Sequence, residues 1–192
     1  MKKILAACVV SIAFANPTYA VPILNPGNGH YYEYVDDLLT WDGAFAAAAA
    51  STHLGLGGYL ATITSPAEQA FIAGITGDVT WLGGTDRSAE GVWEWENGPE
   101  AGSIFFGPGA PVGAFAFWSG GEPNNCCGGE DDLVFGWGGG ESWNDIGTPA
   151  FPTYEVGYIV EYSEAAAVPE PASLLLLGAG LIGMSRRVLR RF

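Results

Sequence analysis

Cysteine is scarce in this chain of 192 residues, which holds only Cys8, Cys126 and Cys127. Small exported domains normally spread an even number of cysteines along the chain as a disulfide framework. Here Cys126 and Cys127 are adjacent and cannot close a large loop, while Cys8 lies in a leader that we expect to be removed. The adjacent pair could form a strained vicinal disulfide, remain as thiols or cross-link two molecules. A disulfide-built scaffold is therefore excluded, and the fold must rest on its core, to which seven tryptophans contribute, and on any bound metal.

Basic residues are also scarce between the two ends of the chain. The sequence has 7 Lys and Arg against 21 Asp and Glu, and its formal net charge is −14. Between residues 21 and 164 the single basic side chain is that of Arg87. Such an acidic surface repels nucleic-acid phosphates and anionic membrane surfaces, so we predict no nucleic-acid partner. It suits cations and neutral glycans, although a high net charge also serves the solubility of an exported protein.

Histidine is equally rare, and the sequence offers little to an enzyme. Neither His30 nor His53 lies in a recognisable pairing of nucleophile and base, and no phosphate-binding loop is present. Cys126 or Cys127 in its glycine-rich loop is the remaining candidate nucleophile, and no clear base accompanies it. We therefore predict that the protein is not an enzyme.

Both ends of the chain have the composition of processing segments. Residues 1–20 combine Lys2 and Lys3, an apolar stretch and a small-residue site ending at Ala20, the pattern of a secretory signal peptide. We expect the folded domain over residues 21–163, a linker with its Pro-Glu-Pro motif over residues 164–171, and a hydrophobic segment with a basic tail over residues 172–192. Thirteen apolar residues of helix span roughly 20 Å, which is short against the roughly 30 Å of bilayer hydrocarbon.

The motif Pro169-Glu170-Pro171, the apolar segment and the closing arginines together resemble a PEP-CTERM sorting signal. The resemblance implies transient anchoring in the inner membrane with the positive side in the cytoplasm, followed by cleavage by a sorting transpeptidase of the exosortase type. Such systems belong to Gram-negative bacteria that make exopolysaccharide, so the mature protein is expected at the cell surface or in the extracellular matrix. A plain C-terminal membrane anchor is the alternative interpretation.

The domain itself is predicted to hold two helices among short strands. Thr40 is a plausible N-cap for a helix over residues 41–51, and Thr64 or Ser65 for a second helix over residues 66–75, which begins with a proline. From their aromatic and β-branched residues, strands are expected over residues 31–35, 59–63, 81–84, 93–95, 133–135 and 157–162. The first strand is expected at a sheet edge, paired with the last. The glycine- and proline-rich residues 98–117 are expected to form a long loop.

Oxygen-bearing side chains are concentrated in residues 121–145. Glu122, Glu130 and Asp145 offer carboxylates, and Asn124 and Asn144 offer amide oxygens. A hard cation such as calcium takes roughly six to eight oxygen ligands. Three carboxylates leave a divalent ion with about one net negative charge, and asparagine oxygens ligate without adding repulsion. The set therefore predicts a calcium site.

These five residues also resemble the EPN-type sugar site of the C-type lectin-like domain. In that family the Glu and Asn of EPN, a later Glu, and the Asn and Asp of WND bind one calcium; the matching residues are Glu122, Asn124, Glu130, Asn144 and Asp145. The resemblance implies that two vicinal sugar hydroxyls complete the calcium shell and contact Glu122, Asn124, Glu130 and Asn144. The EPN order goes with mannose, glucose, N-acetylglucosamine or fucose, and the QPD order that goes with galactose is absent.

The resemblance extends along the domain and implies an α+β, C-type lectin-like fold. Residues 58–69 match the segment that joins the family's two helices, residues 81–84 match its central strand, and residues 157–162 match its closing strand. The implied architecture has two helices flanking small antiparallel sheets, with a long calcium-binding loop region. The family's two disulfides have no counterpart, because the matching positions, near Ser51 with Val160 and at Asp132 with a residue near Gly147, hold no cysteine.

A second group of residues matches the family's auxiliary calcium site. Asp86 and Glu90 match two of its carboxylates, and Asp131 matches a third. Asn125 stands where the family often has Asp, which leaves the auxiliary ion an open question. The alternative is that Asp86 and Glu90 flank Arg87 on a solvated loop.

Together these patterns predict an exported, calcium-dependent carbohydrate-binding protein of the mannose, glucose or fucose type. Its expected partners are glycans or exopolysaccharide, together with the sorting transpeptidase and, before processing, the inner membrane. The alternative is a structural or protein-binding adhesin in which calcium only stabilises the loop.

Overall fold

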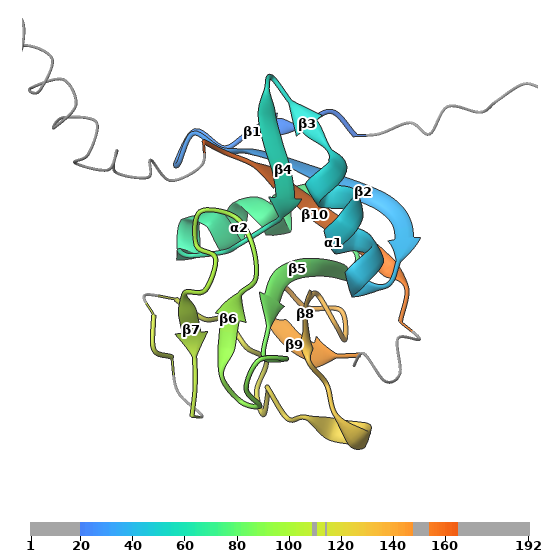
Figure 1. Cartoon of the computed structure of the whole chain (residues 1–192), viewed down its shortest axis with the longest axis vertical. Helices are drawn as coiled ribbons and strands as arrows, with labels where there is room; N and C mark the ends of the chain where they lie inside the picture. Colours follow the sequence, from blue (N-terminus) through green and yellow to red (C-terminus); the bar gives the residue numbers. More distant parts are fainter. Residues whose placement is uncertain (1–19, 109–110, 114, 148–153, 165–192) are drawn as a thin grey trace, which may run out of the picture.

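The computed structural model describes residues 20–108, 111–113, 115–147 and 154–164 (Figure 1). They form an α+β fold, in which two helices lie against a branched and mostly antiparallel sheet. Apart from Ala20 and Glu164, the expected signal peptide, the Pro-Glu-Pro linker and the hydrophobic C-terminal segment lie outside the described residues. Within the described part of the chain, no helix has the length and hydrophobicity needed to cross a membrane.

The elements are short and follow one another closely. In chain order they are β1 (Ile23–Leu24), β2 (Tyr31–Leu39), α1 (Trp41–Ala50), β3 (Thr52–His53), β4 (Leu56–Leu60), α2 (Pro66–Ile75), β5 (Thr80–Thr85), β6 (Trp93–Trp95), β7 (Ile104–Phe106), the 3₁₀ turn η1 (Cys126–Gly128), β8 (Asp132–Phe135), β9 (Trp143–Ile146) and β10 (Val156–Tyr162).

The sheet is organised around β10, which pairs with β2, β4 and β5. The main path runs β1-β2-β10-β5-β6-β7, and β8 with β9 branches from β5. The pair β10–β5 is parallel, and the other strand pairs among the described residues are antiparallel. Tyr162 lies opposite Tyr31, so the first long strand and the last strand pair as predicted. Figure 1 shows β2 and β10 in the upper half of the view, whereas the loop that carries η1 lies at the bottom.

Both helices begin where the sequence predicts, because both starts are capped. The Thr40 hydroxyl accepts from a first-turn N–H of α1 at 3.3 Å, and the Ser65 hydroxyl accepts from the Glu68 N–H at 3.2 Å. Pro66 fills the first position of α2, where its missing N–H leaves nothing unpaired. Ser65, not Thr64, is therefore the cap of α2. The Glu68 carboxylate adds a second tie by accepting from the Thr64 N–H at 2.7 Å.

Tryptophan side chains fill two buried clusters that hold the sheet and helices together. Trp93, Trp95 and Trp143 belong to one cluster, and Trp41 and Trp81 belong to the other. The two tryptophans of β6 point inward, as the alternation of the strand predicts. Because a buried aromatic side chain removes roughly 150–250 Å² from water, such clusters stabilise the domain without a disulfide framework.

The structure differs from the sequence prediction at three strands. The strand at Tyr31 is not at the edge, because the short β1 pairs with its outer side. The strand expected over residues 59–63 runs instead over Leu56–Leu60, since its beginning is paired with β3 in a hairpin. Ile104–Phe106, expected within a loop, forms β7 against β6. In each case the strand is defined by its pairing partner, which composition does not reveal.

Candidate functional site

The loop of residues 121–130 is attached to the β-strand that carries the remaining predicted ligands. The Trp143 N–H donates to the Phe117 carbonyl, and the Ser119 N–H donates to the Trp143 carbonyl, each at 2.8 Å. These bonds place the chain entering the loop beside the start of β9, where Asn144 and Asp145 follow Trp143 directly. The Glu122–Pro123 peptide bond that opens the loop is cis.

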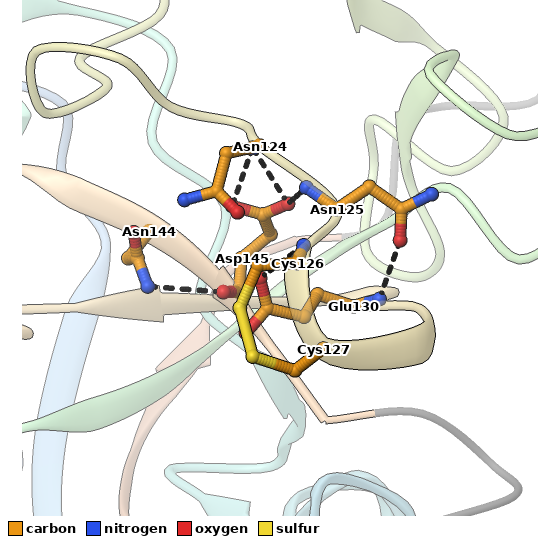
Figure 2. Close-up of a disulfide and its surroundings, with 7 residues drawn as sticks. All are labelled: Asn124, Asn125, Cys126, Cys127, Glu130, Asn144 and Asp145. Carbon is orange, nitrogen blue, oxygen red and sulfur yellow. Dashed lines mark hydrogen bonds between the residues drawn. A yellow bond between two sulfur atoms is a disulfide. The ribbon is translucent and has the colours of Figure 1, made fainter.

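Asp145 lies at the centre of the site and is fully buried. Its carboxylate accepts from the Asn124 N–H at 3.0 Å and from the Asn125 N–H at 2.8 Å (Figure 2). Two backbone amides of the loop therefore point at one side chain of β9. The loop and the strand are held together by this carboxylate.

Glu130 closes the loop on its other side. Its carboxylate accepts from the Cys126 N–H at 2.9 Å, and its own N–H donates to the side-chain oxygen of Asn125 at 2.8 Å. Burial raises the pKa of Glu130, the Cys126 N–H opposes that change, and the charge of Asp145 adds to it. Glu130 and Asp145 thus share one electrostatic environment.

Glu122 joins the same group from the start of the loop. Burial, the hydrogen bond to Asp145 and the charges of Asp145 and Glu130 raise the pKa of Glu122. One of its carboxylate oxygens, Oε2, is buried and has no hydrogen-bond partner. A buried oxygen without a hydrogen-bond donor costs free energy. Because two other carboxylates act on Glu122, this oxygen is suited to binding a cation.

These features fit a divalent cation. The charge of Asp145 contributes to the raised pKa values of Glu122 and Glu130, and one buried oxygen of Glu122 has no partner. The ligand atoms of these three carboxylates do not all lie within 4.8 Å of one another, so a bound ion would have to draw them closer. A bound cation would relieve the repulsion between the carboxylates, and the unpartnered Glu122 oxygen would coordinate it. Calcium prefers hard oxygen ligands of this kind. Among the predicted ligands, Glu122 and Glu130 interact electrostatically with Asp145, and the Asn124 N–H donates to the Asp145 carboxylate. The Asn144 side chain donates to the Asp145 carbonyl at 3.0 Å.

The predicted auxiliary residues are only partly brought together. Asp86 is buried after β5, and burial raises its pKa to about 7, with the charges of Glu90 and Asp131 contributing in the same direction. One Asp86 oxygen accepts from a backbone N–H at 2.8 Å, and the other is buried without a partner. Asn125 directs its side-chain oxygen to the Glu130 N–H instead. Asp86 is thus influenced by the charges of Glu90 and Asp131, while the Asn125 side chain contacts the Glu130 backbone.

The two adjacent cysteines form a disulfide within the loop. Of the three states that the sequence left open, the structure has the vicinal disulfide. It lies in η1 between Asn125 and Glu130, next to the carboxylates (Figure 2).

A further polar group was missed by the sequence analysis. Ligand atoms of His30, Glu68 and Glu161 lie within 4.8 Å of one another, an arrangement that could hold a metal ion. His30 Nδ1 lies 2.6 Å from the Glu161 carboxylate, and the Tyr32 hydroxyl donates to both glutamates. Glu161 in the otherwise apolar residues 157–162 was the signal in the sequence, because a charged residue that alternates into a core requires a partner.

Two family models match the chain. The model described as "Lectin C-type domain" matches residues 40–131, and the model of the PEP-CTERM protein-sorting motif matches residues 167–191. The lectin match includes the EPN sequence and Glu130, whereas Asn144 and Asp145 lie beyond its end. Lectin C-type domains are non-enzymatic binding modules that generally bind calcium.

Among curated proteins, halomucin of Haloquadratum walsbyi is 40% identical over 136 residues, 70% of this chain and 1% of halomucin. The hepatic lectin of Gallus gallus is 36% identical over 104 residues, covering 54% of this chain and 42% of that protein. The chain thus spans less than half of the length of either relative.

Solved structures share the fold. The C-type lectin CEL-I from Cucumaria echinata aligns with a TM-score of 0.53 and 26% identity, over 70% of this chain and 90% of CEL-I. A Ca²⁺-dependent type II antifreeze protein aligns with a TM-score of 0.56 and 21% identity, over 74% of this chain and 97% of that one. The second likeness concerns the fold alone.

Proposed function

Because the chain carries a C-type lectin domain and a PEP-CTERM sorting motif, we propose that it is an exported protein that binds carbohydrate in a calcium-dependent manner. The observation that carries the proposal is the interaction of Glu122 and Glu130, which lie on the loop, with Asp145 on β9, together with an unpartnered buried oxygen on Glu122. Lectin domains in the related proteins support carbohydrate binding in general. Calcium dependence and the kind of sugar are parts of the proposal.

Calcium would be held by Glu122, Asn124, Glu130, Asn144 and Asp145. When bound, it supplies a Lewis-acidic centre for two neighbouring hydroxyls of a sugar. A hydroxyl both donates and accepts, so it can give its proton to a carboxylate and accept from an asparagine NH₂ at the same time. Glu122 and Glu130 serve as acceptors, and Asn124 and Asn144 offer donors.

The order of Glu122 and Asn124 around Pro123 favours sugars with equatorial hydroxyls at positions 3 and 4. Mannose, glucose, N-acetylglucosamine and fucose present that arrangement, and this expectation rests on the EPN resemblance. We further propose that Asp86, Glu90, Asn125 and Asp131 serve an auxiliary calcium ion, for which the buried unpartnered oxygen of Asp86 gives support.

The ends of the chain complete the proposal. Residues 1–20 would direct export and be removed, and residues 21–163 would form the binding domain. Residues 164–171 would contain the processing site, and residues 172–192 would hold the chain in the inner membrane until a transpeptidase of the exosortase type acts. The PEP-CTERM match supports this route, which ends at the cell surface or in an exopolysaccharide matrix.

A glycan array tests the proposal. The full chain in mild detergent should give a signal for mannose- or fucose-type glycans in calcium, and chelation should remove it. Asn124→Asp should abolish or change the preference, because Asp lacks the NH₂ donor. Leu38→Asp, which adds the same charge at an exposed position of β2, is the matched control and should keep the preference. A signal that persists in chelator contradicts the proposal.

A protein-binding adhesin is the second candidate. It is favoured by the hydrogen bonds from the Cys126 and Asn125 N–H groups to Glu130 and Asp145, because carboxylates that hold the loop in this way could bind calcium only to stabilise it. A pull-down partner that mannose and fucose fail to displace, together with a silent glycan array, would favour the adhesin.

A further inference from the structure

The Cys126–Cys127 disulfide joins neighbouring residues, so it cannot act as a staple for the fold. Disulfides stabilise mainly by shortening the loops available to the unfolded chain, and the gain grows with the number of residues enclosed. A sequence separation of 1 encloses almost nothing. The effect of this disulfide must therefore be local, and its surroundings are the proposed calcium loop.

Hydrogen bonds connect the disulfide turn to the carboxylate group on both sides. The Cys126 N–H donates to the Glu130 carboxylate at 2.9 Å, and the Cys126 carbonyl accepts from the Gly129 N–H at 3.0 Å. The residue before the pair, Asn125, donates from its N–H to Asp145 at 2.8 Å. The turn thus aims two consecutive amides at two different predicted ligands of the same ion (Figure 2).

The backbone of the turn is unusual at two residues that are not glycine. Asn125 has a φ of 47° and Cys127 a φ of 60°, both in the left-handed region. That region costs a residue with a β-carbon roughly 1–2 kcal/mol, and Asn tolerates it better than Cys. A covalent link between the two side chains restricts the alternatives that Cys127 could otherwise adopt.

We propose that the Cys126–Cys127 disulfide positions Glu130 and the loop amides for calcium, so that the oxidised protein binds calcium more tightly than the reduced protein. The inference rests on the proposed function of the loop. Reduction frees the side chains of both cysteines, the amide of Cys126 is no longer directed at Glu130, and the carboxylate loses its fixed orientation. Groups that orient metal ligands without touching the metal typically change metal affinity by about 10- to 100-fold when removed.

The redox step is balanced by an ordinary dithiol. The disulfide accepts two electrons and two protons from the dithiol, the S–S bond breaks, two cysteine thiols form, and the dithiol becomes a cyclic disulfide. Cys127 is exposed and Cys126 is half-buried, so an attacking thiolate can reach the bond from solvent. In the exporting compartment the reverse reaction, with a disulfide oxidant, forms the bond.

Calcium titration calorimetry of the full chain in mild detergent tests the inference. Calcium alone is the probe, with and without a dithiol, and alkylation followed by peptide mass spectrometry shows whether Cys126 and Cys127 themselves are reduced. We expect the Kd to rise about 10-fold on reduction. The double variant Cys126→Ser/Cys127→Ser should bind like the reduced protein and show no response to the dithiol.

A second measurement separates positioning from general stability. Without calcium, the urea midpoint of the oxidised protein and of the double variant should agree closely, because the disulfide encloses no loop. Equal Kd values for the oxidised and reduced forms would overturn the inference and leave the proposed function intact. If the oxidised protein binds no calcium, the proposed function fails and this inference fails with it.

Discussion

Arg87 is the only basic side chain between residues 21 and 164, and it is committed to structure. Its guanidinium donates to the buried Asp132 at 2.8 Å and to the exposed Asp42, and it lies 4.5 Å from the centre of the Trp41 ring. Asp132 occupies one of the positions at which related domains were expected to hold a cysteine. At this position the chain has an ion pair with Arg87, whose guanidinium lies over the Trp41 ring.

Replacing Arg87 by Met should destabilise the domain by about 2–3 kcal/mol, because Asp132 is left buried and unpaired. The loss should be smaller at pH 5 than at pH 8. Burial already raises the pKa of Asp132 to about 7, and removal of Arg87 raises that pKa further. Below the raised pKa the variant buries a neutral Asp132, and as the pH rises through that pKa the variant loses stability because Asp132 becomes a buried, unpaired charge. Urea unfolding at both pH values measures this. The double variant Arg87→Met/Asp132→Leu should recover most of the stability, and no recovery would refute the pairing.

His30 carries a second pH-dependent contribution. The hydrogen bond to the buried Glu161 carboxylate raises the pKa of His30 above its usual value of 6.5. The stabilisation is complete below pH 6.5 and is lost as the pH rises through the raised value. His30→Gln should therefore cost about 1.5 kcal/mol at pH 6 and much less at pH 9, measured by urea unfolding.

At the scale of the element, β5 is a strand with no room for a larger side chain at two of its positions. All six of its residues are buried. A β-carbon on Gly83 would lie 2.7 Å from the Leu60 carbonyl, and one on Gly84 would lie 2.7 Å from the Leu133 side chain. The two glycines let neighbouring segments approach the strand on both of its faces.

Gly84→Ala should destabilise the domain by about 1–3 kcal/mol, because the added methyl group meets Leu133 and Phe105 in a packed core. Gly74→Ala provides the matched control. Gly74 lies inside α2 with nothing near its added β-carbon, so that change should stabilise by up to about 1 kcal/mol. Thermal unfolding of both variants gives the comparison, and a similar sign for the two would contradict the packing described for β5.

Local signals explain which elements the sequence predicts well. The start of α2 follows from Ser65 and Pro66, whose effects act within one turn of helix. β1 and β7 could not be predicted, because each is a short strand whose existence depends on a distant partner. For the site, the identity of the five predicted ligands follows from their order in the chain. The amides of Asn124, Asn125 and Cys126 that hold those carboxylates are backbone groups, which no residue type reveals.

At the scale of the whole molecule, calcium should act as a stabilising ligand. A ligand that binds only the folded chain at about 100 times its Kd adds about 2.7 kcal/mol to the free energy of unfolding. Urea unfolding in calcium and in chelator at equal ionic strength should show an increase of this size. Magnesium is the control and should add less, because it requires smaller octahedral geometry and gives up its water reluctantly. If both ions raised the free energy of unfolding equally, the increase would come from general charge screening, and the prediction of a calcium site would be contradicted.

The pairing of β10 with β2 has a consequence for display. Tyr162, the last residue of β10, lies opposite Tyr31. In Figure 1 the strands β2 and β10 lie in the upper half of the view, away from the loop that carries η1 at the bottom. If the chain is attached to a surface just after Ser163, the acidic loop therefore points away from that surface. Many copies attached in this way would present the same loop in the same orientation, so weak binding at each loop would combine into multivalent binding of a branched target.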